Sequence, residues 1–118
     1  MDVKHRWRDY RTAGGARPVA EFIASRSLLD RVEIAAAMKD VCDHGVRTTA
    51  RHLRGPLYEV RANGVDESYR LIFAQEGRKG RVLLALVVLS KKTQKTPERD
   101  LRLAERRLGD WRDRGRCD

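Results

Sequence analysis

The stretch Val82-Leu83-Leu84-Ala85-Leu86-Val87-Val88-Leu89 decides the fold, because it is the longest uninterrupted apolar run in the sequence. A run of this length cannot cross a membrane as a helix, which takes about 20 apolar residues. Its three valines and its lack of charge indicate a strand that is covered on both faces of a sheet. We therefore expect residues 82–89 to form a central strand.

Two further strands are expected before this run, with turn residues between them. Apolar and charged residues alternate over positions 58–62, and the turn pair Asn63-Gly64 follows. Strand-forming residues resume over 69–73, and the glycine-containing segment 76–80 makes a second turn. The pattern predicts consecutive antiparallel strands joined by hairpins.

The N-terminal part of the chain is expected to hold a short edge strand and two helices. Residues 3–10 have strand character, and a glycine-rich break at 12–16 follows. Pro18 suits the first position of a helix, and a second helix is predicted over 28–44 with Gly45 as its stop. The expected buried stripe of this second helix consists of Leu28, Val32, Ala35 or Ala36, Met38, Val41 and Cys42.

A final helix is predicted after the tripeptide Thr96-Pro97-Glu98. Thr96 can cap the free amides, Pro97 suits the first helical position, and Glu98 suits the helix dipole. The expected buried stripe consists of Leu101, Ala104, Leu108 and Trp111. The 118 residues are enough for one core. We expect a single α+β domain in which an N-terminal helical hairpin packs on a small, mostly antiparallel sheet, with a C-terminal helix.

The charge balance points to a polyanionic partner. The chain has 26 Lys and Arg against 17 Asp and Glu, a formal net charge of +9, which favours nucleic acid over a membrane surface.

The first residues lack the apolar core of a signal peptide, so we expect a cytoplasmic protein. Cys42 and Cys117 have no companion at metal-ligand spacing, so we expect reduced thiols and neither a metal nor a cofactor.

Cations are concentrated around the end of the apolar run. Arg61 and Arg70 alternate away from their apolar neighbours, and we expect them to share a face with these cations if their strands are adjacent. Crowded like charges repel one another, and a bound phosphate chain would relieve that repulsion. The alternative is an ordinary solvated surface, which is the usual place of lysine and arginine. No acidic residue interrupts the segment that contains Arg78, Lys79, Arg81, Lys91, Lys92 and Lys95.

Three segments resemble motifs of the RelE/HigB-like toxin superfamily, in particular its phage-derived HigB-like branch. They are Gly55-Pro56-Leu57-Tyr58-Glu59-Val60-Arg61, Tyr69-Arg70-Leu71-Ile72-Phe73 and Lys91-Lys92-Thr93-Gln94-Lys95-Thr96-Pro97. Their order and spacing fit over nearly the whole chain. The resemblance implies the toxin of a type II toxin–antitoxin system, which cleaves messenger RNA, in many relatives on the ribosome, and thereby inhibits translation and growth.

The resemblance also implies partners and site residues. The partner would be an antitoxin from the adjacent gene, often a helix-turn-helix protein through which the complex reaches operator DNA. The chemistry would be metal-independent, with an RNA 2′-hydroxyl attacking its neighbouring phosphate. The implied catalytic residues are Arg61, Arg70, Lys91 and Lys92. Lys95 would bind the RNA backbone, and Tyr69 would either stack on a base or pack in the sheet. On charge alone, Arg78, Lys79 and Arg81 are further RNA-binding candidates, with a solvated turn as the alternative.

One segment departs from the family pattern. Many relatives carry a histidine or acid, a glycine and an aromatic residue just before the lysine segment, where this chain has Val87-Val88-Leu89. Valine can neither transfer a proton nor stack on a base. Two alternatives to a ribonuclease therefore stay open: a toxin-fold protein that binds RNA and antitoxin without cleavage, and a gyrase-poisoning toxin. Of the three histidines, His52 is the best substitute for the missing acid or base, and His5 and His44 are expected to be structural or solvated.

Overall fold

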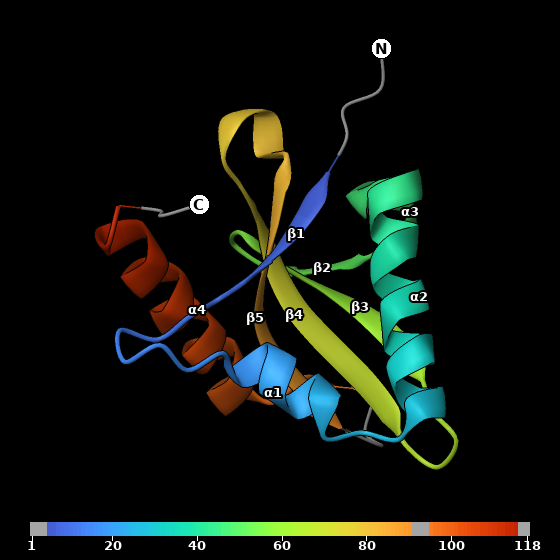
Figure 1. The fold of residues 1–118 in the computed structure, drawn as a ribbon. Helices are drawn as coiled ribbons and strands as arrows, with labels where there is room; N and C mark the ends of the chain where they lie inside the picture. Colours follow the sequence, from blue (N-terminus) through green and yellow to red (C-terminus); the bar gives the residue numbers. More distant parts are fainter. Residues whose placement is uncertain (1–4, 91–94, 116–118) are drawn as a thin grey trace.

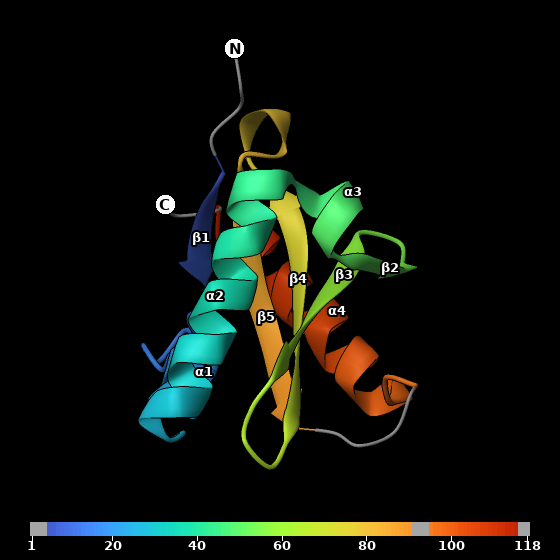
Figure 2. The ribbon, with the colours of Figure 1, turned by 90° about the vertical axis from the view of Figure 1, so that its right-hand side faces the viewer.

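The computed structural model describes residues 5–90 and 95–115 as a five-stranded sheet with helices on both faces (Figures 1 and 2). The strand order is β1 (Arg6–Asp9), β5 (Val82–Ser90), β4 (Ser68–Glu76), β3 (Leu57–Asn63) and β2 (Arg51–Arg54). β1 runs parallel to β5, and the other three pairs are antiparallel. The predicted α+β fold class is confirmed.

The apolar run that forms β5 is buried on both faces, as predicted. Leu84 and Leu86 pack in one hydrophobic cluster, Leu83 and Ala85 pack in another, and all four are fully buried. The strand lies between β1 and β4, so β4 is the middle strand of the five. Four neighbouring residues thus supply both cores, which explains why no charge occurs in this stretch.

One face of the sheet carries α1 (Pro18–Ala24), α2 (Leu28–His44) and the short α3 (Val46–Thr49). Pro18 opens α1, and Gly45 ends α2 with a positive φ of 86°, which glycine adopts without strain. Val19, Val41 and Val46 of these helices pack against Leu71, Phe73 and Leu83 of the sheet. The predicted helical hairpin and its bounds are confirmed, and α3 was not predicted.

The predicted buried stripe of α2 is wrong in part. Leu28 is 66% exposed and Val32 is 54% exposed, whereas Asp30 and Ile34 are buried together with Val41. Asp30 faces inward because its carboxylate accepts hydrogen bonds from the Val65 amide and the Tyr69 hydroxyl. A polar anchor therefore rotates the first turns of the helix away from the face that apolar spacing alone predicts.

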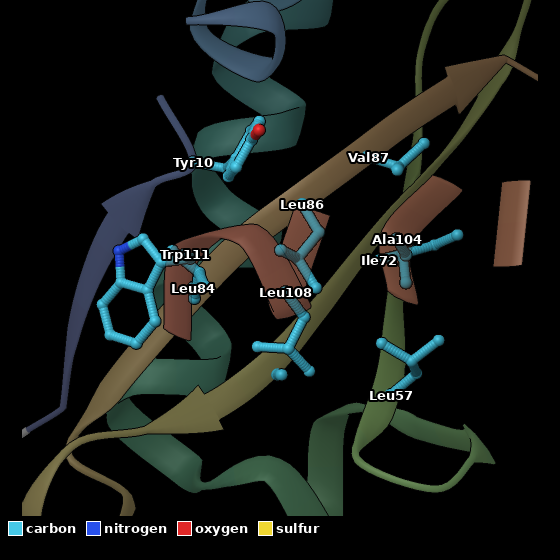
Figure 3. Close-up of a cluster of buried hydrophobic side chains, with 10 residues drawn as sticks. Tyr10, Leu57, Ile72, Leu84, Leu86, Val87, Ala104, Leu108 and Trp111 are labelled. Carbon is cyan, nitrogen blue, oxygen red and sulfur yellow. The ribbon is translucent and has the colours of Figure 1, made fainter. Parts of the chain in front are cut away.

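The other face of the sheet carries α4 (Glu98–Asp113), whose Ala104, Leu108 and Trp111 point into the core (Figure 3). This stripe is as predicted. The expected cap is wrong: Pro97 occupies the N-cap position, and the Thr96 hydroxyl bonds to the sheet instead of the free helix amides. Glu98 and Asp100 in the first turn still favour the positive end of the helix dipole.

Three smaller features complete the structure. β1 lies at the sheet edge as expected, and residues 1–4 lie outside the described ranges. β2 was not predicted, and a 3₁₀ turn, η1 (Arg78–Gly80), follows β4. Cys42 is a partly buried free thiol whose pKa burial raises, and Cys117 lies outside the described residues. No helix of the described part is long and apolar enough to cross a membrane.

Candidate functional site

Arg61 and Arg70 lie directly opposite each other on β3 and β4. Their apolar neighbours along both strands face the α1–α2 side of the sheet, so the two arginines lie on the α4 side. The two strands are adjacent and the two arginines share a face with each other, whereas the expected shared face with Lys91 and Lys92 concerns residues outside the described ranges. Two cations at opposed positions of an antiparallel pair repel each other unless an anion lies near.

That anion is Glu59, which is 1% exposed and precedes Arg61 by two residues on the same face. The Thr96 hydroxyl lies 3.1 Å from Oε1 of Glu59 and donates to it, while Nη1 of Arg70 donates to the same hydroxyl oxygen at 3.2 Å. Nε of Arg61 lies 4.0 Å from Oε2 of Glu59. We call Glu59, Arg61, Arg70 and Thr96 the Glu59 centre.

The Glu59 centre borders an open surface pocket of about 410 Å³, which brings two more cations to it. Arg51 lies opposite Glu59 in the β2–β3 pairing, and Lys95 precedes Thr96. Arg51 is not among the residues expected at the site, because the sequence pattern predicts no strand over residues 51–54; the basic run from Arg47 to Arg54 is the signal that could have indicated it. The pocket is lined by Arg51, Leu53, Lys95, Thr96 and Leu101.

Exposure separates the roles that the two arginines can have. The Arg61 side chain is 48% exposed, so a ligand in solution can reach it. Arg70 is 3% exposed and lies beneath, bound to Thr96. Arg70 therefore holds the centre together, and Arg61 presents the accessible guanidinium.

The implied catalytic lysines, Lys91 and Lys92, lie outside the described residues. The described ends of their segment both adjoin the Glu59 centre. Ser90 pairs with Tyr69, next to Arg70 along β4, and Thr96 is part of the centre itself.

The cations of the β4–β5 turn do not join this site. Arg78, Lys79 and Arg81 lie in or next to the η1 turn, which joins β4 to β5 beyond the Glu76–Val82 pair (Figure 1). Arg70 pairs with Leu89 near the opposite end of the same two strands. Arg70 and Glu76 are six positions apart along β4, which corresponds to roughly 20 Å at about 3.3 Å per residue. The single cationic edge that the sequence suggested is therefore two separate groups.

Tyr69 packs in the core, which is the second of the two alternatives considered for it. Its side chain is 2% exposed on the α2 side, and its hydroxyl donates to Asp30. Burial and the hydrogen bonds to Asp30 and Glu67 raise its pKa to about 12. A ring in this position cannot stack on an RNA base.

The residues that depart from the family pattern also take definite places. Val87 is 4% exposed and packs in the α4 core, while Leu89, opposite Arg70, lies closest to the Glu59 centre. His52 faces the other side of the sheet, where it packs edge-on against Tyr58 and its Nε2 lies 2.8 Å from the Gly55 carbonyl oxygen. His52 therefore does not reach the Glu59 centre.

His44 is exposed at the end of α2, and His5 precedes β1.

The arrangement can bind an anion and can stabilise negative charge. No group of three or more histidine, cysteine, aspartate or glutamate side chains that could hold a metal ion occurs among the residues that the structure describes. Arg61 and Arg70 lie beside one buried carboxylate, and Arg51 and Lys95 line the adjoining pocket.

A family model described as phage derived protein Gp49-like (DUF891) matches residues 21–109. That match spans three quarters of the 118 residues, and it includes β3, β4, β5 and most of α4. The chain therefore belongs to the Gp49-like family, a RelE/HigB-like group of toxin–antitoxin toxins. No curated protein matches the chain. The resemblance seen in the sequence is confirmed at the level of the family.

Proposed function

We propose that this protein is the ribonuclease toxin of a type II toxin–antitoxin system, which cleaves messenger RNA and so inhibits translation, and that the Glu59 centre is its active site. The observation that carries the proposal is the cross-strand pair of Arg61 and Arg70 around a buried carboxylate, beside Lys95 and the start of α4. Family membership supports a toxin with an antitoxin partner.

The proposed reaction needs charge stabilisation more than a strong base. The 2′-oxygen of one nucleotide bonds to its neighbouring phosphorus, the bond from phosphorus to the 5′-oxygen breaks, and a 2′,3′-cyclic phosphate results. Arg61 contacts the phosphate, whose charge increases in the transition state. Lys91 or Lys92 gives a proton to the leaving 5′-oxygen, and the 2′-hydroxyl proton passes to solvent. Lys95 and Arg51 hold the adjoining phosphates.

The experiment incubates messenger RNA with the purified protein, in the presence and in the absence of ribosomes, and measures cleavage of the RNA. The Arg61→Ala protein should cleave about 100- to 1,000-fold more slowly, because one charge-stabilising group is worth about 2.7–4 kcal/mol. Arg31→Ala is the matched control, since Arg31 is an exposed arginine on α2, across the sheet from Arg61. Cleavage that is equal in parent, Arg61→Ala and Lys91→Ala proteins would overturn the proposal.

A second function, binding of RNA and antitoxin without cleavage, is favoured by the residue at position 89. Leu89 lies across from Arg70, where a proton-transferring side chain would adjoin the phosphate. Position 87 is buried in the α4 core, so Leu89→His tests this point better than Val87→His does. If Leu89→His cleaves RNA and the parent does not, the parent is a binding protein. If the parent cleaves RNA by itself, this second function is excluded.

A further inference from the structure

A second pocket, of about 860 Å³, lies at the sheet edge farthest from the Arg51 pocket. It is formed by β1, the loop after it and the C-terminal part of α4, where Figure 3 shows Trp111 beside β1. β1 and β2 are the two outer strands of the sheet, so this pocket and the Glu59 centre are separate sites. The lining residues are Trp7, Arg8, Asp9, Arg11, Arg17, Trp111 and Arg114.

β1 offers an open backbone edge to this pocket. In a parallel pair, alternate residues direct their peptide groups toward the partner strand. The amides of Arg6 and Tyr10 bond to the carbonyls of Arg81 and Ala85 before and along β5, at 2.9 and 3.0 Å. Trp7 and Asp9, which alternate with these residues, therefore direct their peptide groups outward. β1 ends the described strand order, so one further strand can pair there (Figure 2).

The side chains of the pocket carry an excess of positive charge. Its lining has four arginines and one acid, Asp9, which pairs with Arg17 at 2.6 Å. Asp110 adds a second acid next to the pocket, paired with Arg114 at 2.8 Å. Among the residues that the structure describes at this pocket, arginines outnumber acids by four to two, and an acidic ligand suits that excess.

The pocket walls also have the residue types that dominate protein–protein binding energy. Tryptophan and arginine are enriched among such residues. Both tryptophans are already held in place: the Trp7 indole donates to the Met38 carbonyl at 2.8 Å, and Trp111 packs in the α4 core. A nucleic acid could use the arginines and the open N–H groups of β1, whereas an extended polypeptide would also pair with the open carbonyl groups in strand register.

We propose that the β1 edge binds an extended acidic segment of a partner protein, which adds a sixth strand beside β1 and places its carboxylates against Arg11, Arg17 and Arg114. The arginines select the charge of the segment, and the peptide groups of Trp7 and Asp9 fix its extended conformation. This interaction does not depend on the Glu59 centre or on RNA cleavage.

The test uses amide NMR spectra of the full chain and a synthetic heptapeptide of alternating glutamate and valine. The peptide should shift the Trp7 and Asp9 amide signals and slow their hydrogen exchange at least tenfold, because they become hydrogen-bonded. The amides of Arg6 and Tyr10 are internal controls, since β5 already protects them. A peptide with lysine in place of glutamate, and one with N-methylated peptide groups, should bind at least tenfold more weakly.

Variants separate this site from general attraction between opposite charges. Arg11→Glu should weaken binding of the acidic peptide about tenfold, and Arg31→Glu on α2 should leave it unchanged; the amide spectra show whether each variant is folded. The proposal is overturned if the acidic peptide causes no shift at millimolar concentration or if Arg31→Glu weakens it equally. It is also overturned if oligouridylate shifts Trp7 and Asp9 at concentrations where the peptide does not, which would make the pocket a nucleic-acid site.

Discussion

Glu59 is a charged side chain that is buried, although strand alternation places it on the polar face of β3. The buried carboxylate of Glu59 and the buried guanidinium of Arg70 are joined through Thr96, whose hydroxyl donates to Glu59 and accepts from Arg70. A buried charge is tolerated when its partners are fixed, and removing one partner is costly. At this scale the site depends on a threonine that has no charge of its own.

The Thr96→Val substitution tests that dependence. Valine has nearly the shape of threonine but can neither donate nor accept, so Glu59 and Arg70 would each lose a buried hydrogen bond. The free energy of unfolding should fall by about 1–3 kcal/mol, as expected for an unsatisfied buried polar group. Urea denaturation measures the change. Thr96→Ser keeps the hydroxyl and should lose less than about 1 kcal/mol, the value of one methyl group; equal losses for the two variants would contradict the role of the network.

Tyr69 gives stability a dependence on alkaline pH. Its pKa is raised to about 12 in the folded protein from 10.0, mainly by burial. Above pH 10 the unfolded chain loses the phenolic proton first, so the stability that Tyr69 contributes is complete below pH 10 and is lost as the pH rises toward 12. Tyr69→Phe should therefore lose less stability over this window than the parent. Urea denaturation at several pH values measures the free energy of unfolding of both proteins. If this free energy falls equally with pH in the two proteins, Tyr69 is not the cause of the alkaline loss of stability.

At the scale of elements, α2 shows that the bounds of a helix and its buried face are set by different residues. Ser27 caps the helix and Gly45 ends it, and both signals are local. The buried face depends on Asp30, whose partners lie 35 and 39 residues away on the β3–β4 loop and β4. The exposed stripe of Leu28, Leu29 and Val32 follows from this orientation.

A pair of alanine substitutions tests the orientation of α2. Ile34 is 2% exposed, so Ile34→Ala should lower the free energy of unfolding by about 2–5 kcal/mol through lost burial and a cavity. Val32 is 54% exposed, and Val32→Ala should change the free energy by less than about 0.5 kcal/mol. Thermal or urea unfolding of the two proteins measures both. The reverse order would restore the stripe that apolar spacing predicts.

The elements also show how far the sequence carries the prediction of the site. Strand alternation correctly placed Arg61 and Arg70 on one face, because that property follows from the backbone alone. The burial of Glu59 could not be predicted, since its partner Thr96 lies 37 residues away. β2 was missed because Arg51–Arg54 is a short, basic strand at the sheet edge, with no alternation strong enough to mark it.

For the whole molecule, the main consequence of the fold is that the cations considered above as binding residues lie in three separate places. The Glu59 centre with Arg51 and Lys95 lies at one end of the β4–β5 hairpin, and the turn that carries Arg78, Lys79 and Arg81 lies at the other. The arginines of the β1 pocket lie at a sheet edge. A net charge of +9 therefore describes several surfaces, and each can have its own ligand.

Salt dependence of RNA binding distinguishes these surfaces. Each phosphate that a cation neutralises on a single strand contributes about 0.7 to the slope of log affinity against log salt concentration. A dinucleotide, which has a single internal phosphate, cannot reach both ends of the hairpin, which are roughly 20 Å apart. With this short RNA, Arg61→Ala should reduce the steepness of the slope by about 0.7, and Arg78→Ala should leave the slope unchanged.

With an RNA of about 20 nucleotides, both variants should reduce the steepness of the slope. The slope of the parent protein should be roughly −3 to −4 for about four to six contacted phosphates. Fluorescence anisotropy at several salt concentrations gives these slopes. If Arg78→Ala has no effect on the longer RNA either, the turn cations do not bind RNA; if Arg61→Ala has none on either RNA, the Glu59 centre does not bind phosphate.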